Sequence, residues 1–247
     1  MQDAFRHLPD LRDRVTPPDE SELRVTAEVL AFWNQRARDL GRPANWRLSD
    51  QEIENSRHAV LGGLGTGQDL WIYGYGSLMW DPGFHFAEVR LADLQGYQRR
   101  FSYRTTLGRG CLEQPGLMLS LERSAGCCRG LAFRVAAEMV DTETTIVWRR
   151  EMIRGGYRPA LLPVSTPQGD ITALAFAPNL AHPDYVGELP LNETAAIIAR
   201  GAGVLGTNRE YLENLVAQIE HLDIEDAYMT QLLEQVRMDT AACSANP

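Results

Sequence analysis

One segment of the chain combines glycines with a serine in a way that could form a binding site. It consists of Gly74, Tyr75, Gly76, Ser77, Leu78 and Met79, and it follows the apolar run that begins at Leu70. A glycine turn at the end of a strand can point successive backbone N–H groups at a carboxylate or a developing oxyanion. Glycine leaves room for a ligand to approach the backbone. A plain turn between two elements has the same pattern, so both interpretations stay open.

Glu151 is the second residue that could do chemistry. It falls on the same helical face as Val147 and Trp148, close to a stop at Gly155. Desolvation on an apolar face and the negative end of a helix both raise the pKa of a carboxyl group, which suits a proton shuttle near neutral pH. The alternative is a structural ion pair with Arg154 at i+3 or with another nearby arginine.

The basic residues exclude several classes of enzyme. All 24 are arginine, because the sequence contains no lysine. Schiff-base enzymes, pyridoxal-phosphate enzymes, P-loop nucleotidases and protein kinases each require a lysine. With 33 acidic residues the net charge is −9, which argues against a nucleic-acid interface. We therefore expect small molecules or proteins as partners.

Three other motifs are too weak to define a site. Gly201, Gly203 and Gly206 have the GxGxxG spacing of a dinucleotide fingerprint, but a helix rather than a strand is predicted before them. Ser77 lacks the second glycine of a GxSxG nucleophile elbow. The five histidines have no metal-ligand spacing. The sequence therefore predicts no metal and no cofactor.

Compartment and redox state follow from what the chain lacks. No apolar run approaches the roughly 20 residues of a membrane span, and the N-terminus lacks the apolar stretch of a signal peptide. We expect a cytoplasmic protein without membrane insertion. The four cysteines, which show no CxxC spacing, are expected to be reduced thiols; they are Cys111, Cys127, Cys128 and Cys243.

Hydrophobic periodicity places these residues on elements. Between positions 70 and 177 alternating patterns predict six or seven short strands, which suggests a barrel or a strongly curled sheet. Among these segments are 71–75, 86–94, 97–104, 117–121, 131–135, 158–164 and 171–177. Helices are predicted within 20–40, over 140–151 with Glu151 near its end, and at 191–200, 208–222 and 224–237. Thr207 and Glu210 form a capping-box pair before the fourth of these.

Several motifs in order resemble one family. They are Trp71-Ile-Tyr-Gly-Tyr-Gly-Ser-Leu-Met-Trp80, Gly96-Tyr-Gln-Arg-Arg-Phe101, Gly108-Arg-Gly110, Arg149-Arg-Glu-Met-Ile-Arg-Gly-Gly-Tyr157, His182-Pro-Asp-Tyr185 and Gly206-Thr-Asn-Arg-Glu-Tyr211. The chain resembles the bacterial ChaC-type γ-glutamylcyclotransferases from about Trp71 to Leu222. The resemblance implies an α+β fold, a γ-glutamylcyclotransferase-like small mixed β-barrel with flanking helices. It also implies cleavage of glutathione to 5-oxoproline and cysteinylglycine.

The resemblance also implies roles for individual residues. The turn Gly74 to Met79 would hold the γ-glutamyl group, and Glu151 would be the catalytic glutamate. Tyr211 and Arg104 are further pocket candidates, although each could instead be a packed aromatic and a surface charge. The predicted division is an N-terminal helical arm (1–70), a catalytic domain (71–222) and a C-terminal helix and tail (223–247).

Two alternatives remain at this level. The protein could be a regulator that binds a cation transporter without catalysis, or a cyclotransferase for another γ-glutamyl compound. Glu151 beside an intact glycine turn favours an enzyme, because a binding protein has no need of a carboxylate on an apolar face. The oligomeric state is not predicted.

Overall fold

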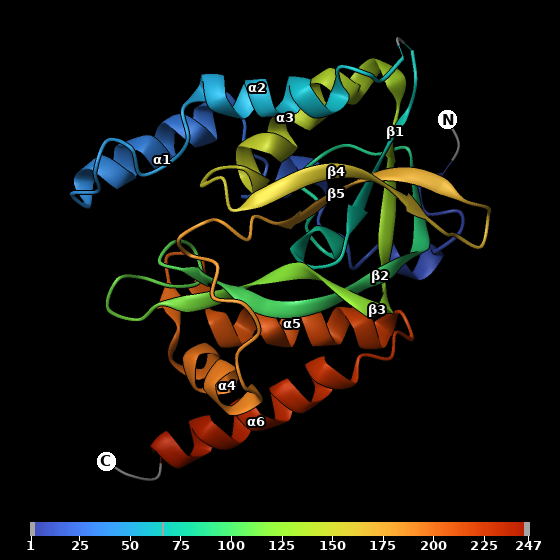
Figure 1. The fold of residues 1–247 in the computed structure, drawn as a ribbon. Coiled ribbons are helices and arrows are strands. Elements are labelled where there is room, and N and C mark those ends of the chain that lie inside the picture. The colour runs from blue at the N-terminus through green and yellow to red at the C-terminus, as the bar shows by residue number, and fades with distance from the viewer. Residues whose placement is uncertain (1–2, 66, 245–247) are drawn as a thin grey trace. The chain divides into compact units, whose positions relative to one another are not determined.

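A computed structural model describes residues 3–65 and 67–244 of the chain, with side chains as far as Asp239 (Figure 1). The chain groups into two units. The first contains the residues up to Tyr97 together with Arg123–Asn179, and the second contains Gln98–Glu122 and the residues from Leu180 onward. Two long strands, β2 (Glu88–Thr105) and β3 (Gly116–Val135), run through both units. The predicted division into arm, catalytic domain and tail stays a prediction.

One mixed sheet contains all the long strands. Its order is β2-β3-β1-β5-β4, with β1 (Leu70–Gly74) at the centre. Strand β1 pairs antiparallel with β3 and parallel with β5 (Ile171–Pro178). Strand β4 (Tyr157–Val164) pairs with β5 and lies at the edge. Its two prolines fit this place, because proline has no N–H to donate to a ladder and is therefore tolerated on edge strands.

The two edge strands of this sheet meet at one point. Asp93 of β2 and Ser165, just after β4, form an isolated antiparallel bridge through two backbone hydrogen bonds of 2.8 and 3.0 Å. The sheet therefore curls toward closure, but among the described residues no ladder joins β2 to β4. The mixed sheet and the helices that precede and follow it in the chain confirm the predicted α+β class. The predicted small barrel is not fully closed among the described residues.

The strands are fewer and longer than the sequence pattern predicts. Segments 86–94 and 97–104, expected as separate strands, form the single strand β2, and the segments around 117–121 and 131–135 form β3. Gly96 explains the first difference. It has a φ of +81°, so the strand bends there without ending.

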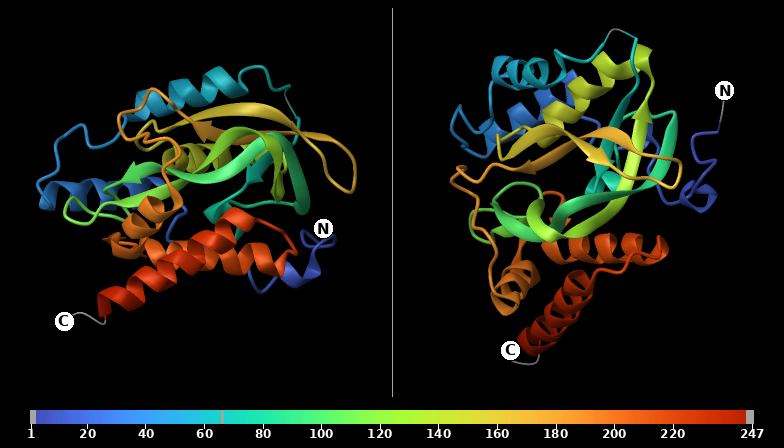
Figure 2. Two further views of the ribbon diagram at one scale, coloured as in Figure 1. Left: turned by 60° about the horizontal axis from the view of Figure 1, so that its bottom comes forward. Right: turned by 45° about the vertical axis from the view of Figure 1, so that its right-hand side comes forward.

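Three helices belong to the first unit. They are α1 (Ala27–Asp39), α2 (Asp50–Leu61) and α3 (Val140–Glu151). Helix α1 begins later than its apolar pattern suggests, where the Thr26 side chain accepts from the N–H of Val29. Helix α2 was not predicted, although Ser49 and Glu52 form a full capping box at its start. It lies alongside α3 (Figures 1 and 2).

The second unit has its own helices. Helices α4 (Leu191–Arg200), α5 (Asn208–His221) and α6 (Ala227–Ser244) pack together (Figure 2). The GxGxxG segment forms the short hairpin of β6 (Ala202–Gly203) and β7 (Gly206–Thr207), followed directly by α5. These glycines therefore serve a turn and close packing. None of the helices in the described part of the chain has the length and hydropathy of a membrane span.

Candidate active site

The glycine turn directly follows the central strand. Strand β1 ends at Gly74, and a short 3-10 helix, η3 (Ser77–Met79), begins after Gly76. A β-carbon at Gly74 would lie 3.1 Å from the Leu78 β-carbon and 3.4 Å from the Phe133 ring. The chain thus folds back tightly on itself at this point, which favours a glycine at position 74.

Part of the turn's hydrogen-bonding capacity is used internally. The Met79 N–H donates to the Gly76 carbonyl at 2.8 Å, and the N–H groups of Trp80 and Asp81 donate to the Ser77 carbonyl at 3.2 and 2.8 Å. The N–H groups of Gly76, Ser77 and Leu78 have no backbone acceptor among the described residues. These three donors are the ones that could meet an anion, whereas Met79 closes the turn.

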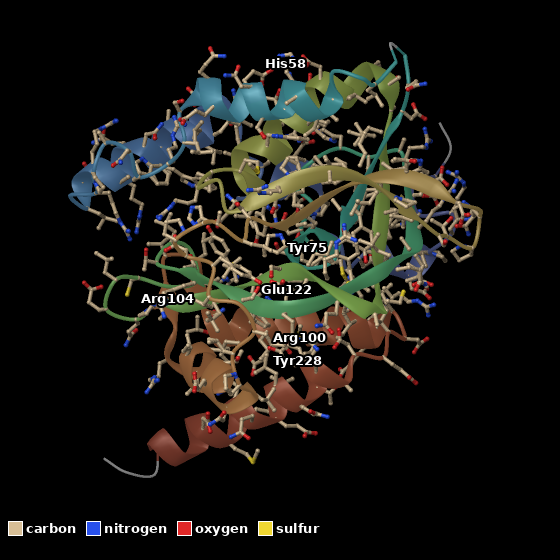
Figure 3. All side chains as sticks on the ribbon, in the orientation of Figure 1. His58, Tyr75, Arg100, Arg104, Glu122 and Tyr228 are labelled. Carbon is tan, nitrogen blue, oxygen red and sulfur yellow. The ribbon has the colours of Figure 1, made fainter. Side chains whose placement is uncertain are left out.

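Tyr75 fixes the turn to the sheet. Its hydroxyl donates to the Phe176 carbonyl in β5 at 2.9 Å, and its ring stacks on Tyr73 with centroids 6.3 Å apart. Figure 3 labels Tyr75 among the side chains of this unit. With only 7% of its surface exposed, Tyr75 gives the turn a rigid base on two strands.

Glu151 is the last residue of α3, as predicted. Its side chain is 16% exposed, and burial raises its pKa above the ordinary value, with the positive charge of Arg150 opposing the rise. The Arg150 Nε atom lies 3.1 Å from the Glu151 Oε1 atom. The pKa is therefore raised, as the sequence interpretation expects, and the carboxylate has a nearby arginine, Arg150.

Arg150 links this carboxylate to the turn, and sequence reasoning missed it. Its Nη2 donates to the Ser77 hydroxyl at 2.9 Å, and its Nη1 donates to the carbonyls of Asp81 and Pro82 at 2.7 and 3.2 Å. The side chain is only 8% exposed. A single guanidinium thus contacts Glu151, the turn and the loop after the turn. The sequence offers two adjacent arginines here and does not reveal which one points inward.

The other two candidate residues belong to the second unit. Tyr211 is 4% exposed on α5 and packs edge-to-face on Phe101, with ring centroids 6.0 Å apart. Arg104, labelled in Figure 3, is exposed on β2, where its backbone N–H donates to the Asp184 carbonyl at 2.8 Å. A role for either residue in substrate binding stays a prediction.

The second unit also contains a partly buried polar cluster that sequence reasoning did not identify. Glu122 accepts from the hydroxyls of Ser102 and Ser120, the latter at 2.8 Å, and from Tyr185 at 3.0 Å. Burial and the bond to Glu122 raise the pKa of Tyr185 to about 12. His182 contacts the Tyr103 hydroxyl. These bonds fix the His182–Tyr185 motif to β2 and β3.

No group of three or more His, Cys, Asp or Glu residues within the described part of the chain is placed to hold a metal ion. Cys111, Cys127 and Cys128 are not joined in disulfides. Cys243 lies outside the described side chains.

Comparisons with known proteins place this fold. The model of the ChaC-like protein family matches residues 70–239. A protein of Escherichia coli (strain K12) named glutathione-specific γ-glutamylcyclotransferase is 38% identical over 169 residues, covering 68% of this chain and 73% of that protein. A Homo sapiens protein, glutathione-specific γ-glutamylcyclotransferase 1, is 36% identical over 182 residues, covering 68% of this chain and 82% of that protein.

A solved structure agrees at the level of the fold. The crystal structure of a yeast γ-glutamylcyclotransferase specific to glutathione superposes with a TM-score of 0.64 at 22% identity, covering 69% of this chain and 96% of that one. The fold is thus the α+β fold of the γ-glutamylcyclotransferases. The chain belongs to the ChaC-like protein family.

Proposed function

We propose that this protein is a γ-glutamylcyclotransferase that cleaves glutathione into 5-oxoproline and cysteinylglycine. One observation carries the proposal: a glutamate with a raised pKa is joined through Arg150 to the glycine turn that ends the central strand. Membership of the ChaC-like family and the names of the relatives in Escherichia coli and Homo sapiens support the same reaction.

The reaction needs few polar groups, because the substrate supplies its own nucleophile. The α-amine of the γ-glutamyl group attacks its own γ-carbonyl carbon, a five-membered lactam closes, and the bond to the cysteinyl nitrogen breaks. Intramolecular attack of this kind reaches effective molarities of about 10⁵ M or more when the reacting atoms are held roughly 3 Å apart. The main task of the enzyme is therefore to hold the folded conformer.

Glu151 is the proposed proton shuttle. The substrate amine arrives mainly as ammonium, so it loses one proton to solvent before the attack and a second as the lactam forms, and the cysteinyl nitrogen must gain one when it leaves. A carboxylate whose pKa is raised by burial can take the proton released as the lactam forms and give it to the leaving nitrogen. No other titratable group is needed for these two transfers.

The glycine turn is the proposed oxyanion site. Attack on the γ-carbonyl produces a tetrahedral oxyanion, which the N–H groups of Gly76, Ser77 and Leu78 would meet. Loss of one such donor costs roughly 3–4 kcal/mol in other enzymes. Gly74 and Tyr75 set the position of this turn, and Met79 closes it.

Arg150 is proposed to hold the glycine turn and Glu151 in a fixed position relative to each other. It contacts the Ser77 hydroxyl and the Glu151 carboxylate with different nitrogens of one planar group, and it also binds the loop after the turn. Because the guanidinium fork is rigid, these contacts fix the shuttle relative to the oxyanion donors. Since the chain has no lysine, the carboxylates of glutathione would be met by arginine or by backbone N–H groups. The proposed location is the cytoplasm, where glutathione keeps thiols reduced.

A substrate panel tests the proposal. Purified protein is incubated with glutathione, with γ-glutamylamines and with other γ-glutamyl peptides, and 5-oxoproline is measured. We expect release from glutathione in preference to the others. Release from another compound alone would change the substrate but keep the reaction. If no compound yields 5-oxoproline, the proposed function is wrong, and binding to a transporter becomes the better hypothesis.

A further inference from the structure

We propose that residues 16–24, defined here as the N-terminal segment, position the active site, and that Ser21 and Arg24 are its two positioning residues. The segment lies outside residues 70–239, which the family model matches. It binds the loop of residues 80–83, which also binds Arg150. The inference rests on the proposed function.

Four successive carbonyls of the 80–83 loop are held by the N-terminal segment at the two ends and by Arg150 in the middle. The Trp80 carbonyl accepts from the Thr16 N–H at 2.8 Å, and the Gly83 carbonyl accepts from Arg24 Nη1 at 3.1 Å. The two carbonyls between them, those of Asp81 and Pro82, accept from Arg150. The N-terminal segment therefore fixes the loop at both ends, and Arg150 binds its middle.

The Ser21 side chain and the Leu23 backbone of the segment contact this loop directly. The Ser21 hydroxyl donates to the Asp81 carboxylate at 2.5 Å and accepts from the Leu23 N–H at 3.0 Å, and Ser21 is only 9% exposed. Gly83 has a φ of +67°, and a β-carbon there would lie 3.0 Å from the Leu23 carbonyl oxygen. This close approach of two backbones requires glycine at position 83. The loop and the segment are therefore in direct backbone contact.

Arg24 extends the connection to the helix that carries Glu151. Its guanidinium makes a bidentate pair with Glu143 of α3, at 2.7 and 3.0 Å, and Glu143 is fully buried. The His85 N–H donates to the same carboxylate at 3.0 Å. Bidentate arginine–carboxylate pairs fix geometry as well as supplying energy. Arg24 thus binds the loop after the turn and, about two helical turns before Glu151, the helix itself.

These contacts of the N-terminal segment link the two halves of the proposed site, the turn and α3, separately from Arg150. The turn supplies the oxyanion donors, α3 supplies the proton shuttle, and Arg150 bridges them on the inside. A displacement of about 1 Å between reacting groups can cost roughly a hundredfold in rate. Loosening the 80–83 loop should therefore slow the chemical step more than it weakens substrate binding.

The experiment compares wild type with Ser21→Ala and Arg24→Lys. Arg24→Lys keeps the charge but loses the fork. The matched control is Arg12→Lys, because Arg12 pairs with Asp3, and its side chain is 56% exposed.

The measurements are kcat and KM for 5-oxoproline release from glutathione, and amide hydrogen exchange at Met79, Trp80 and Asp81. We expect kcat to fall about tenfold in both variants with KM within about twofold, and exchange at the three amides to accelerate. Ser21→Thr, which restores the hydroxyl, should recover kcat.

The outcomes separate this inference from the proposed function. If wild type releases no 5-oxoproline, the proposed function fails, and unchanged exchange in Ser21→Ala would then overturn the positioning contact as well. If wild type is active and the folded Ser21→Ala and Arg24→Lys variants keep its kcat, the positioning role is wrong. An equal loss in Arg12→Lys, or a loss explained by the unfolded fraction in a thermal melt, would also overturn it.

Discussion

Two glutamates of the first unit, the buried Glu88 and the partly exposed Glu151, have pKa values shifted in opposite directions. Burial alone would raise the pKa of Glu88, yet contacts with Arg90, Arg6 and Arg134 lower it to about 2. Burial likewise raises the pKa of Glu151, and the opposing positive charge of Arg150 leaves it raised. Desolvation disfavours both ions, so the cationic partners of each carboxyl determine the direction in which its pKa moves.

This difference separates a structural carboxylate from a chemical one. Glu88 lies at the start of β2 and is held by residues from the N-terminus, from its own strand and from β3. A carboxylate held permanently ionised cannot accept and return a proton. Glu151, whose pKa is raised beside Arg150, meets the requirement of the proposed shuttle.

Glu151→Gln should have the largest effect on turnover. Glutamine keeps the size and polarity of the side chain but cannot exchange a proton, so we expect 5-oxoproline release to fall at least about a hundredfold. The fold should remain, because a neutral amide is easier to bury than a carboxylate. Steady-state assays with glutathione and a thermal melt measure the two effects.

Glu151→Asp is the matched control for this change. It keeps the carboxyl group and shortens its reach, so it should retain more activity than the glutamine variant. Wild-type rates of 5-oxoproline release in the folded glutamine variant would contradict the assignment.

Arg150→Met comes next, with an expected loss of about tenfold or more in kcat, because the fork that joins Glu151 to Ser77 disappears. Removing the charge that opposes the rise should also raise the pKa of Glu151 further. Activity that depends on the ionised form of Glu151 would then begin to fall at a higher pH than in wild type when the pH is lowered. The pH profile of kcat/KM measures this shift of the acidic limb.

Arg150→Lys separates charge from geometry. Lysine keeps a positive charge near Glu151 but cannot reproduce three directions of donation. The acidic limb should therefore stay close to that of wild type while kcat remains low. A limb that moves equally in both variants would show that the charge of Arg150 does not tune Glu151.

Local sequence signals predicted the two halves of the site but not their connection. Helical periodicity placed Glu151 near the end of α3, and the glycine pair marked the end of β1. Whether Arg149 or Arg150 points inward depends on where the turn lies in space. The contact between Ser21 and Asp81 joins residues far apart in the sequence, and no periodic pattern encodes it.

The errors in the fold also have physical causes. Gly96 is typical of a strand end, but in the sheet it only bends β2, because its positive φ lets the chain turn locally while the strand continues to Thr105 beside β3. Helix α2 has only two buried positions, Ile53 and Arg57, so its apolar stripe was too narrow to detect. The Ser49 to Glu52 capping box was the available signal.

Glu88→Gln should leave turnover unchanged and alter stability instead. Its pKa of about 2 in the folded protein lies below the ordinary 4.5, so its ionisation stabilises the fold above about pH 4.5, and this contribution is lost as the pH falls toward 2. A shift of this size corresponds to about 3 kcal/mol at neutral pH. Urea unfolding at pH 7 should therefore show the variant less stable by about that amount, and at pH 3 the gap should be less than half as large. An equal gap at both pH values would mean that packing rather than charge makes Glu88 important. A loss of kcat in the folded variant would remove the distinction between the two glutamates.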